Sequence, residues 1–70
     1  MFKGMTYLER GEELWNRAGA QGVAEAVDAY GGVHEAAEAA LEVLQEDEEF
    51  EYEGDAQRDI ISFLEHELGW

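Results

Sequence analysis

The chain has 70 residues, no cysteine and a formal net charge of −14 at pH 7. Its length allows one domain at most, and the missing cysteines exclude disulfide bonds as a source of stability. The charge disfavours direct binding to nucleic acid or to anionic membranes, because a strongly acidic surface attracts cations and basic protein surfaces instead.

The first predicted helix spans residues 7–18. Thr6 and Glu9 have the spacing of a capping box, in which each side chain accepts a hydrogen bond from the other residue's backbone N–H. Apolar and small residues then recur at helical spacing as far as Ala18, and Gly19 suits a left-handed cap at the end of the helix.

Two further helices are predicted in the middle of the chain. Apolar residues repeat with the helical period from Val23 to Tyr30, which predicts a helix over residues 22–30 that ends at Gly31. Alanine and glutamate, both strong helix formers, dominate residues 33–47 and predict the third helix.

The segment 49–53 alternates acidic and aromatic residues with a period of two. This alternation fits either a short strand, paired with residues 1–5, or an extended linker that its aromatic side chains hold in place. Asp55 is a suitable N-cap for a fourth helix over residues 56–68, and Gly69 suits its end.

These elements predict an all-α fold, in which residues 1–70 form a single small bundle of about four helices. The absence of proline and the many alanines favour this architecture. A core of this size contributes only about 3–5 kcal/mol, so good packing, oligomerisation or a partner must supplement it. The expected core consists of Leu8, Leu14, Val23, Val27, Leu41, Leu44, Ile60, Phe63 and Leu64.

Acidic residues form a stripe on the third predicted helix. At about 100° per residue, its five glutamates fall within a sector of roughly 80°. Like charges four residues apart destabilise a helix by a few tenths of a kcal/mol per pair, and no lysine relieves them here. The stripe comprises Glu35, Glu38, Glu42, Glu46 and Glu49.

The acidic character is concentrated in the second half of the chain. Residues 31–70 carry 13 acids and one cation, and seven of those acids lie between Glu46 and Asp55. A solvated surface is one interpretation of this charge. The other is a row of carboxylates that competes with phosphates, because proteins that bind nucleic acid hold its phosphates largely through lysine and arginine.

In size, charge and the acidic residues of its second half, the chain resembles the small nucleic-acid-mimic proteins of phages and mobile elements, such as anti-CRISPR and antirestriction proteins. The resemblance implies a non-enzymatic inhibitor that occupies the DNA- or RNA-binding site of a basic host defence protein. The residues that carry it, and that it implies contact the partner, are Glu35, Glu38, Glu42, Glu46, Asp47, Glu48, Glu49, Glu51, Glu53, Asp55 and Asp59.

Phe50 and Tyr52 stand between glutamates in this acidic run. They are candidates for apolar anchors at the centre of a partner interface, where aromatic residues often dominate the binding energy. Alternatively, they attach the segment 49–53 to the core of the domain. The sequence leaves both interpretations open.

The sequence contains no pattern typical of catalysis or of metal binding. His34 and His66 lack the HExxH spacing and a third ligand, and Ser62 lacks the glycine turn of a nucleophile. A calcium loop that begins at Asp47 fails, because Tyr52 stands where glycine is required. We therefore expect no enzymatic activity and no cofactor.

No apolar run approaches the roughly 20 residues that a membrane span requires, and the first residues lack an apolar stretch of signal-peptide length. We expect a cytoplasmic monomer or homodimer without membrane contact. Two alternatives to mimicry stay open. One is an acidic interaction module, or antitoxin-like subunit, whose charges only steer association with a basic partner. The other is a halophile-adapted domain whose acids serve hydration.

Overall fold

The computed structural model describes residues 6–19, 22–52 and 54–69. Within these ranges the chain forms four α-helices and no strand, so the all-α prediction is confirmed. The helices are α1 (Tyr7–Arg17), α2 (Val23–Tyr30), α3 (Val33–Gln45) and α4 (Ala56–Glu67).

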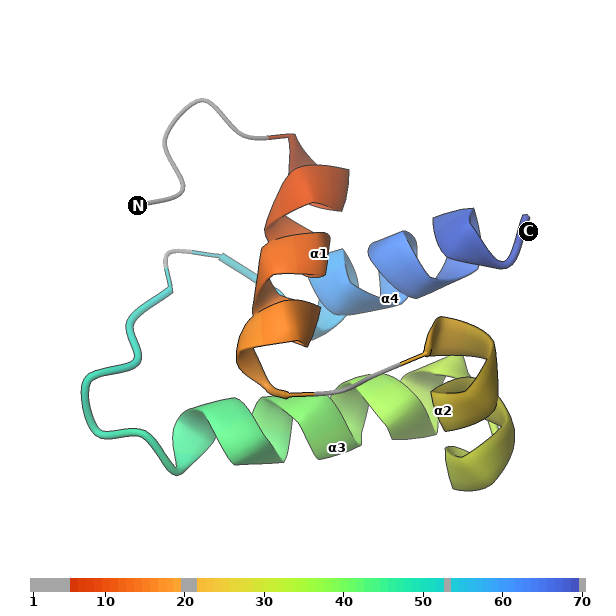
Figure 1. Ribbon diagram of the computed structural model, residues 1–70. Coiled ribbons are helices and arrows are strands. Elements are labelled where there is room, and N and C mark those ends of the chain that lie inside the picture. The colour runs from red at the N-terminus through yellow and green to blue at the C-terminus, as the bar shows by residue number, and fades with distance from the viewer. Residues whose placement is uncertain (1–5, 20–21, 53, 70) are drawn as a thin grey trace.

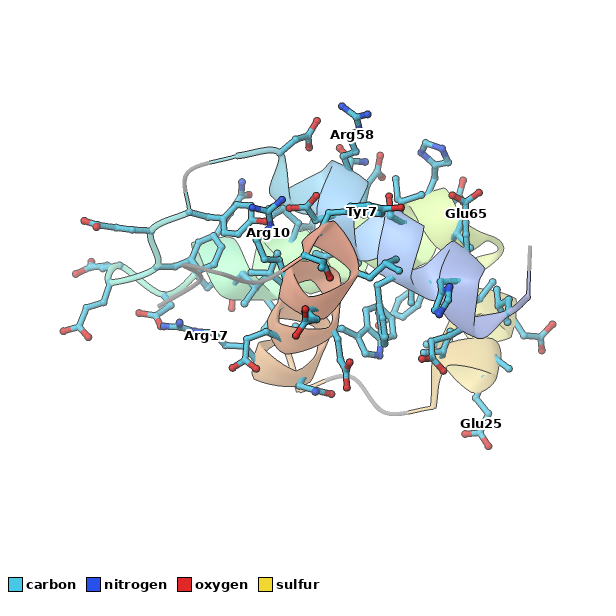
Figure 2. The ribbon with its side chains drawn as sticks, turned by 90° about the horizontal axis from the view of Figure 1, so that it is seen from above. Tyr7, Arg10, Arg17, Glu25, Arg58 and Glu65 are labelled. Atoms are coloured by element: carbon cyan, nitrogen blue, oxygen red, sulfur yellow. The ribbon has the colours of Figure 1, made fainter. Side chains whose placement is uncertain are left out.

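Three of the helices enclose the core. α1 crosses α4, and α3 lies below both in the view of Figure 1. α2 packs on α3, to which a tight turn joins it, and contributes no buried residue. Figure 2 shows the same arrangement from above with its side chains. The long connection from α3 to α4 runs outside the helices and carries most of the acidic run.

Both predicted side-chain caps are present at helix starts. At α1, Glu9 N donates to Thr6 Oγ1 and Thr6 N donates to Glu9 Oε1, each at 3.2 Å, which completes the capping box. At α4, Arg58 N donates to Asp55 Oδ1 at 3.0 Å. The sequence therefore predicted both starts correctly.

Gly31 ends α2, as the sequence predicted. Gly31 has a φ of +92°, a left-handed conformation that disfavours residues with a Cβ atom. The backbone N–H groups of Gly31 and Gly32 both donate to Val27 O, at 3.0 and 2.9 Å. These bonds satisfy a carbonyl that the end of the helix would otherwise leave unpaired.

α3 ends at Gln45, two residues before the predicted end. Asp47 Oδ1 accepts a hydrogen bond from Glu49 N at 2.9 Å, and Asp47 O accepts one from Phe50 N at 3.0 Å. Local hydrogen bonds of this kind, which an aspartate accepts from backbone N–H groups, compete with continuation of the helix. Residues 49–52 form no strand, and the proposed partner segment 1–5 lies outside the described residues.

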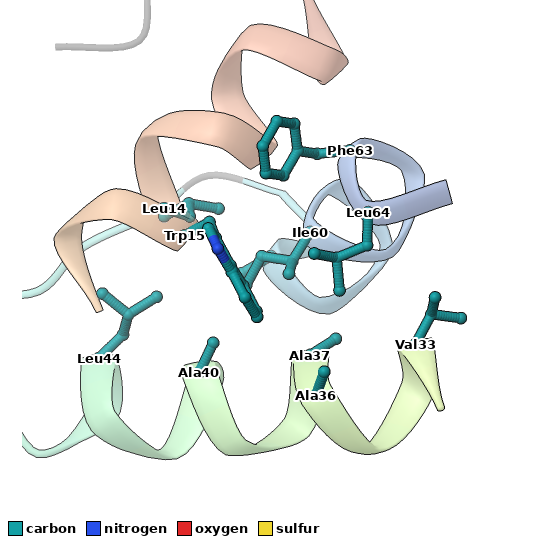
Figure 3. Packing of buried hydrophobic residues seen from close by; sticks show 11 residues of the cluster. Leu14, Trp15, Val33, Ala36, Ala37, Ala40, Leu44, Ile60, Phe63 and Leu64 are labelled. Atoms are coloured by element: carbon teal, nitrogen blue, oxygen red, sulfur yellow. The ribbon is translucent and has the colours of Figure 1, made fainter. Parts of the chain in front are cut away.

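The buried core joins α1, α3 and α4 (Figure 3). Five of the nine expected core residues are buried, namely Leu14, Leu44, Ile60, Phe63 and Leu64. Val23, Val27 and Leu41 are partly buried and pack against this cluster, and Leu8 is partly buried. The buried part of the cluster also contains Trp15, Val33, Ala36, Ala37, Ala40 and Ala56.

The alanines of α3 make room for larger side chains opposite them. Ala36 and Ala37 are fully buried, and Ala40 is only 4% exposed. Trp15 points from α1 toward this side of α3, as Figure 3 shows. Small residues facing large ones allow the close packing typical of protein interiors. α3 therefore has an alanine side directed at the core.

Candidate partner-binding surface

Four of the predicted carboxylates form a continuous exposed row, here called the acidic face of α3. Glu35, Glu38 and Glu42 lie on the helix, and Glu46 caps its end in a helical conformation. At about 100° per residue, this row lies roughly opposite the alanine side of the same helix. Neighbours four residues apart are separated by about 6 Å along the axis. The row therefore points to solvent.

Glu49 does not belong to this row. Because α3 ends at Gln45, Glu49 lies in the turn that Asp47 stabilises, and its predicted position on the helical stripe is wrong. It is nevertheless exposed and belongs to the segment 47–55, here called the acidic loop. The other predicted acids of this loop, Asp47, Glu48, Glu51 and Asp55, are also exposed, and Glu53 lies outside the described residues.

Asp59 differs from the other predicted contact residues because it is only 8% exposed. Tyr52 Oη donates a hydrogen bond to Asp59 Oδ2, and Arg10 Nε lies 3.5 Å from the same oxygen. Asp59 lies one turn before Phe63, on the side of α4 that faces α1. Its carboxylate acts within the fold, so we leave it out of the binding surface.

The contact with Asp59 also attaches the acidic loop to the helices. Burial, followed by the hydrogen bond to Asp59 and the charge of Asp59, raises the pKa of Tyr52 to about 12. The phenol is therefore neutral at physiological pH and donates its proton to the carboxylate. Phe50 and Tyr52 both pack against the core and so attach the described residues 49–52 to it, as the linker interpretation predicts. Their role as anchors for a partner stays a prediction.

The two aromatic side chains also face an open hollow, which the sequence did not predict. Their rings stack at a centroid distance of 6.5 Å with an angle of 8° between the planes. The hollow has a volume of about 820 Å³ and lies where the end of α3, the acidic loop and the start of α4 meet. Its lining comprises Leu41, Gln45, Asp47, Glu48, Phe50, Tyr52, Gly54, Asp55, Ala56 and Gln57.

We call this feature the aromatic hollow. The period-two alternation of the loop was the one sequence signal for it, because that spacing places Phe50 and Tyr52 on the same side of an extended segment. Gln45 and Gln57 carry no comparable signal. They come together only because α3 and α4 pack side by side.

The contacts of the three arginines of the described residues involve groups next to, or outside, the acidic face of α3. Arg17 Nη2 lies 3.7 Å from Asp47 Oδ2, and the guanidinium carbon of Arg17 lies 5.9 Å from the centre of the Phe50 ring. Arg10 and Arg58 line a second hollow of about 540 Å³ beside Tyr7, on the side of the molecule where Figure 2 labels all three.

The described residues show no arrangement suited to metal chemistry. Within ranges 6–19, 22–52 and 54–69, no group of three or more His, Asp or Glu side chains could hold a metal ion. His34 and His66 are both exposed and lie on different helices. No described helix combines the length and apolar character needed to cross a membrane.

Comparison with known proteins adds no relative to this picture. No protein-family model matches the chain, and no curated protein or solved structure is significantly similar to it.

Proposed function

We propose that this protein is a non-enzymatic inhibitor that mimics nucleic acid and occupies the DNA- or RNA-binding site of a basic protein, such as a host defence protein. The observation that supports this proposal is the exposed acidic face of α3, which leads directly into the acidic loop. Together they contain most of the 13 acids that give residues 31–70 their charge.

The physical basis is competition for the same cations. Phosphates recur about every 3.4 Å along each strand of a duplex, and their binding proteins hold them with lysine and arginine. The glutamates of α3 offer the same basic side chains a row of anions about 6 Å apart. Binding should therefore weaken steeply with salt, as it does for nucleic acid.

The test begins with affinity capture of the partner from a host lysate at low salt. The purified partner is then titrated with this protein in the presence of duplex DNA or of RNA. We expect binding of the protein and of one of these nucleic acids to be mutually exclusive. A ternary complex in which the partner holds both at once would contradict mimicry.

Charge variants locate the contact surface. Glu42→Lys together with Glu46→Lys should weaken partner binding more than the corresponding glutamines, since like charges across an interface cost several kcal/mol. A matched control replaces Glu25 and Asp28 with Gln and Asn, because both are exposed on α2, outside this surface. If the α2 control weakens binding as much as Glu42→Gln with Glu46→Gln, the acidic face is not the contact site.

The aromatic hollow supports a second candidate function, an acidic interaction module or antitoxin-like subunit that binds its basic partner mainly through apolar contacts. Its carboxylates would then only steer association. Neutralising Glu38, Glu42 and Glu46 would slow association and leave the dissociation rate nearly unchanged. Mimicry instead requires a clear rise in the dissociation rate.

A further inference from the structure

The chemistry of the aromatic hollow restricts what can occupy it. Its lining combines the partly buried side chains of Leu41, Phe50 and Tyr52 with the exposed carboxylates of Asp47 and Glu48. The exposed carboxylates repel an anion, and a purely aliphatic guest would gain nothing from their negative charge. A suitable guest therefore has a positive charge and a flat or apolar body.

Among protein side chains, arginine fits this description better than lysine. The guanidinium group is planar and weakly hydrated, stacks on aromatic rings and donates paired hydrogen bonds to carboxylates. The lysine ammonium is compact and strongly hydrated, so it loses more when it leaves water for an apolar surface.

The chain itself shows this chemistry beside the hollow. The guanidinium of Arg17 lies 5.9 Å from the centre of the Phe50 ring, and its Nη2 lies 3.7 Å from Asp47 Oδ2. Arg17 belongs to α1, which contributes nothing to the described lining of the hollow. Arg17 of α1 therefore already contacts one aromatic ring, Phe50, and one carboxylate, Asp47, of this site.

The site is also held in place before a guest arrives. Tyr52 is anchored to Asp59 by its hydroxyl group, and its ring stacks with that of Phe50. Ordered contact residues reduce the entropy that binding must offset.

From these observations we propose that the aromatic hollow binds an arginine side chain of the basic partner, seated over Phe50 and Tyr52 and held by the carboxylates of Glu48 and Asp55, beside the existing pair of Arg17 and Asp47. The proposal rests on the proposed function, since it specifies one contact of the same partner surface. In this arrangement the acidic face of α3 contacts the partner's basic side chains, and the hollow selects arginine over lysine.

Two synthetic peptides of equal length and charge test this selection, one with repeated Arg-Gly and one with repeated Lys-Gly. Each is titrated into the protein while the NMR signals of the Phe50 and Tyr52 rings are followed. We expect the arginine peptide to bind about three- to tenfold more tightly and to shift both ring signals. Equal affinities, or binding that leaves the ring signals unchanged, would overturn the proposal.

A matched pair of variants distinguishes the contribution of the hollow to peptide binding from the effect of overall negative charge. Glu48→Gln and Glu38→Gln remove the same charge from exposed sites, but only Glu48 lines the hollow. Glu48→Gln should reduce the preference for the arginine peptide, whereas Glu38→Gln should weaken both peptides equally. If both variants behave identically, the proposal is wrong. Because both side chains are exposed, neither substitution alters the core.

The two proposals fail in different ways. If the captured partner binds nucleic acid and this protein simultaneously while the arginine preference persists, mimicry is wrong and the arginine site stands. If competition with nucleic acid holds while the peptides bind equally well, the inhibitor proposal stands and the arginine site is wrong.

Discussion

Gly11 determines how closely α1 and α4 approach each other. It is buried at their crossing, where an added Cβ atom would lie 2.7 Å from Phe63 Cβ and would overlap the carbonyl oxygen of Asp59. Glycine inside a helix normally costs about 1 kcal/mol relative to alanine. The close contact between the two helices explains why α1 has glycine here.

The substitution Gly11→Ala should therefore destabilise the protein. Its helix-propensity gain of up to about 1 kcal/mol is smaller than the roughly 1–3 kcal/mol that overpacking costs, because a backbone carbonyl cannot move aside as a flexible side chain can. Urea unfolding monitored by circular dichroism measures the difference. Glu12→Ala, at the exposed neighbouring position, should leave stability equal or higher. Stabilisation by Gly11→Ala would show that the helices separate at low cost.

Tyr52 should make stability depend on alkaline pH. Its pKa rises from 10.0 to about 12 in the folded state, so folding favours the protonated phenol. The resulting stabilisation is complete below pH 10 and is lost as the pH rises toward 12. Tyrosinate absorbance should show an ionisation step near pH 12 that Tyr52→Phe removes. The control Tyr7→Phe, at a 53% exposed site, should retain that step. If Tyr7→Phe removes this ionisation step and Tyr52→Phe does not, the step does not belong to Tyr52.

At the scale of single helices, α3 has an unfavourable charge at its C-terminal end. The carboxyl end of a helix carries partial negative charge, and α3 has no basic residue in its last turn. Glu42 and Glu46 add like charges four residues apart at this end. Glu35 is placed favourably, in the first turn of the same helix.

Neutralising the two ends of α3 should consequently have opposite effects. We expect Glu46→Gln to raise the free energy of unfolding by a few tenths of a kcal/mol and Glu35→Gln to lower it by a similar amount. Thermal unfolding of both variants at low salt provides the measurement. Under the inhibitor proposal, Glu46→Gln also weakens partner binding, so a more stable protein binds less well. If both substitutions shift the melting temperature in the same direction, the helix dipole is not the cause of the shifts.

The sequence predicted where each helix lies because capping residues and apolar periodicity are local signals. The capping box of Thr6 and Glu9 and the cap at Asp55 both form as expected. The early end of α3 was missed because it depends on hydrogen bonds that Asp47 accepts from the backbone N–H groups of Glu49 and Phe50, which compete with a sequence that otherwise favours helix.

Features that depend on how helices meet were harder to predict. Ala36 and Ala37 are fully buried, yet small side chains carry a weak hydrophobic signal in a sequence. Asp59 looked like one more surface acid, but it lies where α4 packs on α1 and where Tyr52, seven residues earlier, donates a hydrogen bond to it. The aromatic hollow combines three segments, so the alternation within the acidic loop indicates only the part that Phe50 and Tyr52 contribute.

The whole molecule is small enough for its charges to act on one another throughout. The Cα atoms have a radius of gyration of 11.1 Å, and the chain carries a net charge of −14. Screening lengths are about 10 Å at 0.1 M salt and about 30 Å at 0.01 M. At low salt, nearly every carboxylate therefore repels all the others, which opposes the compact state.

Stability should increase with salt over this range. We expect the melting temperature to rise as NaCl increases from about 0.01 to 0.15 M, as screening reduces the repulsion. A variant with Glu48→Gln and Glu49→Gln has two fewer charges and should gain less over the same range. Differential scanning calorimetry compares the two proteins. If the protein is unfolded at about 0.1 M salt and folds only in molar KCl, the halophile interpretation replaces mimicry.

α3 bears its alanine side and its acidic face on opposite sides of one helix. Substitutions on the acidic face change the charge without altering the volume of any core residue. Under the inhibitor proposal, the surface that contacts the partner can therefore change while the core of the bundle stays the same. The same separation lets an engineer replace the glutamates with another charge pattern and direct this scaffold to a different ligand.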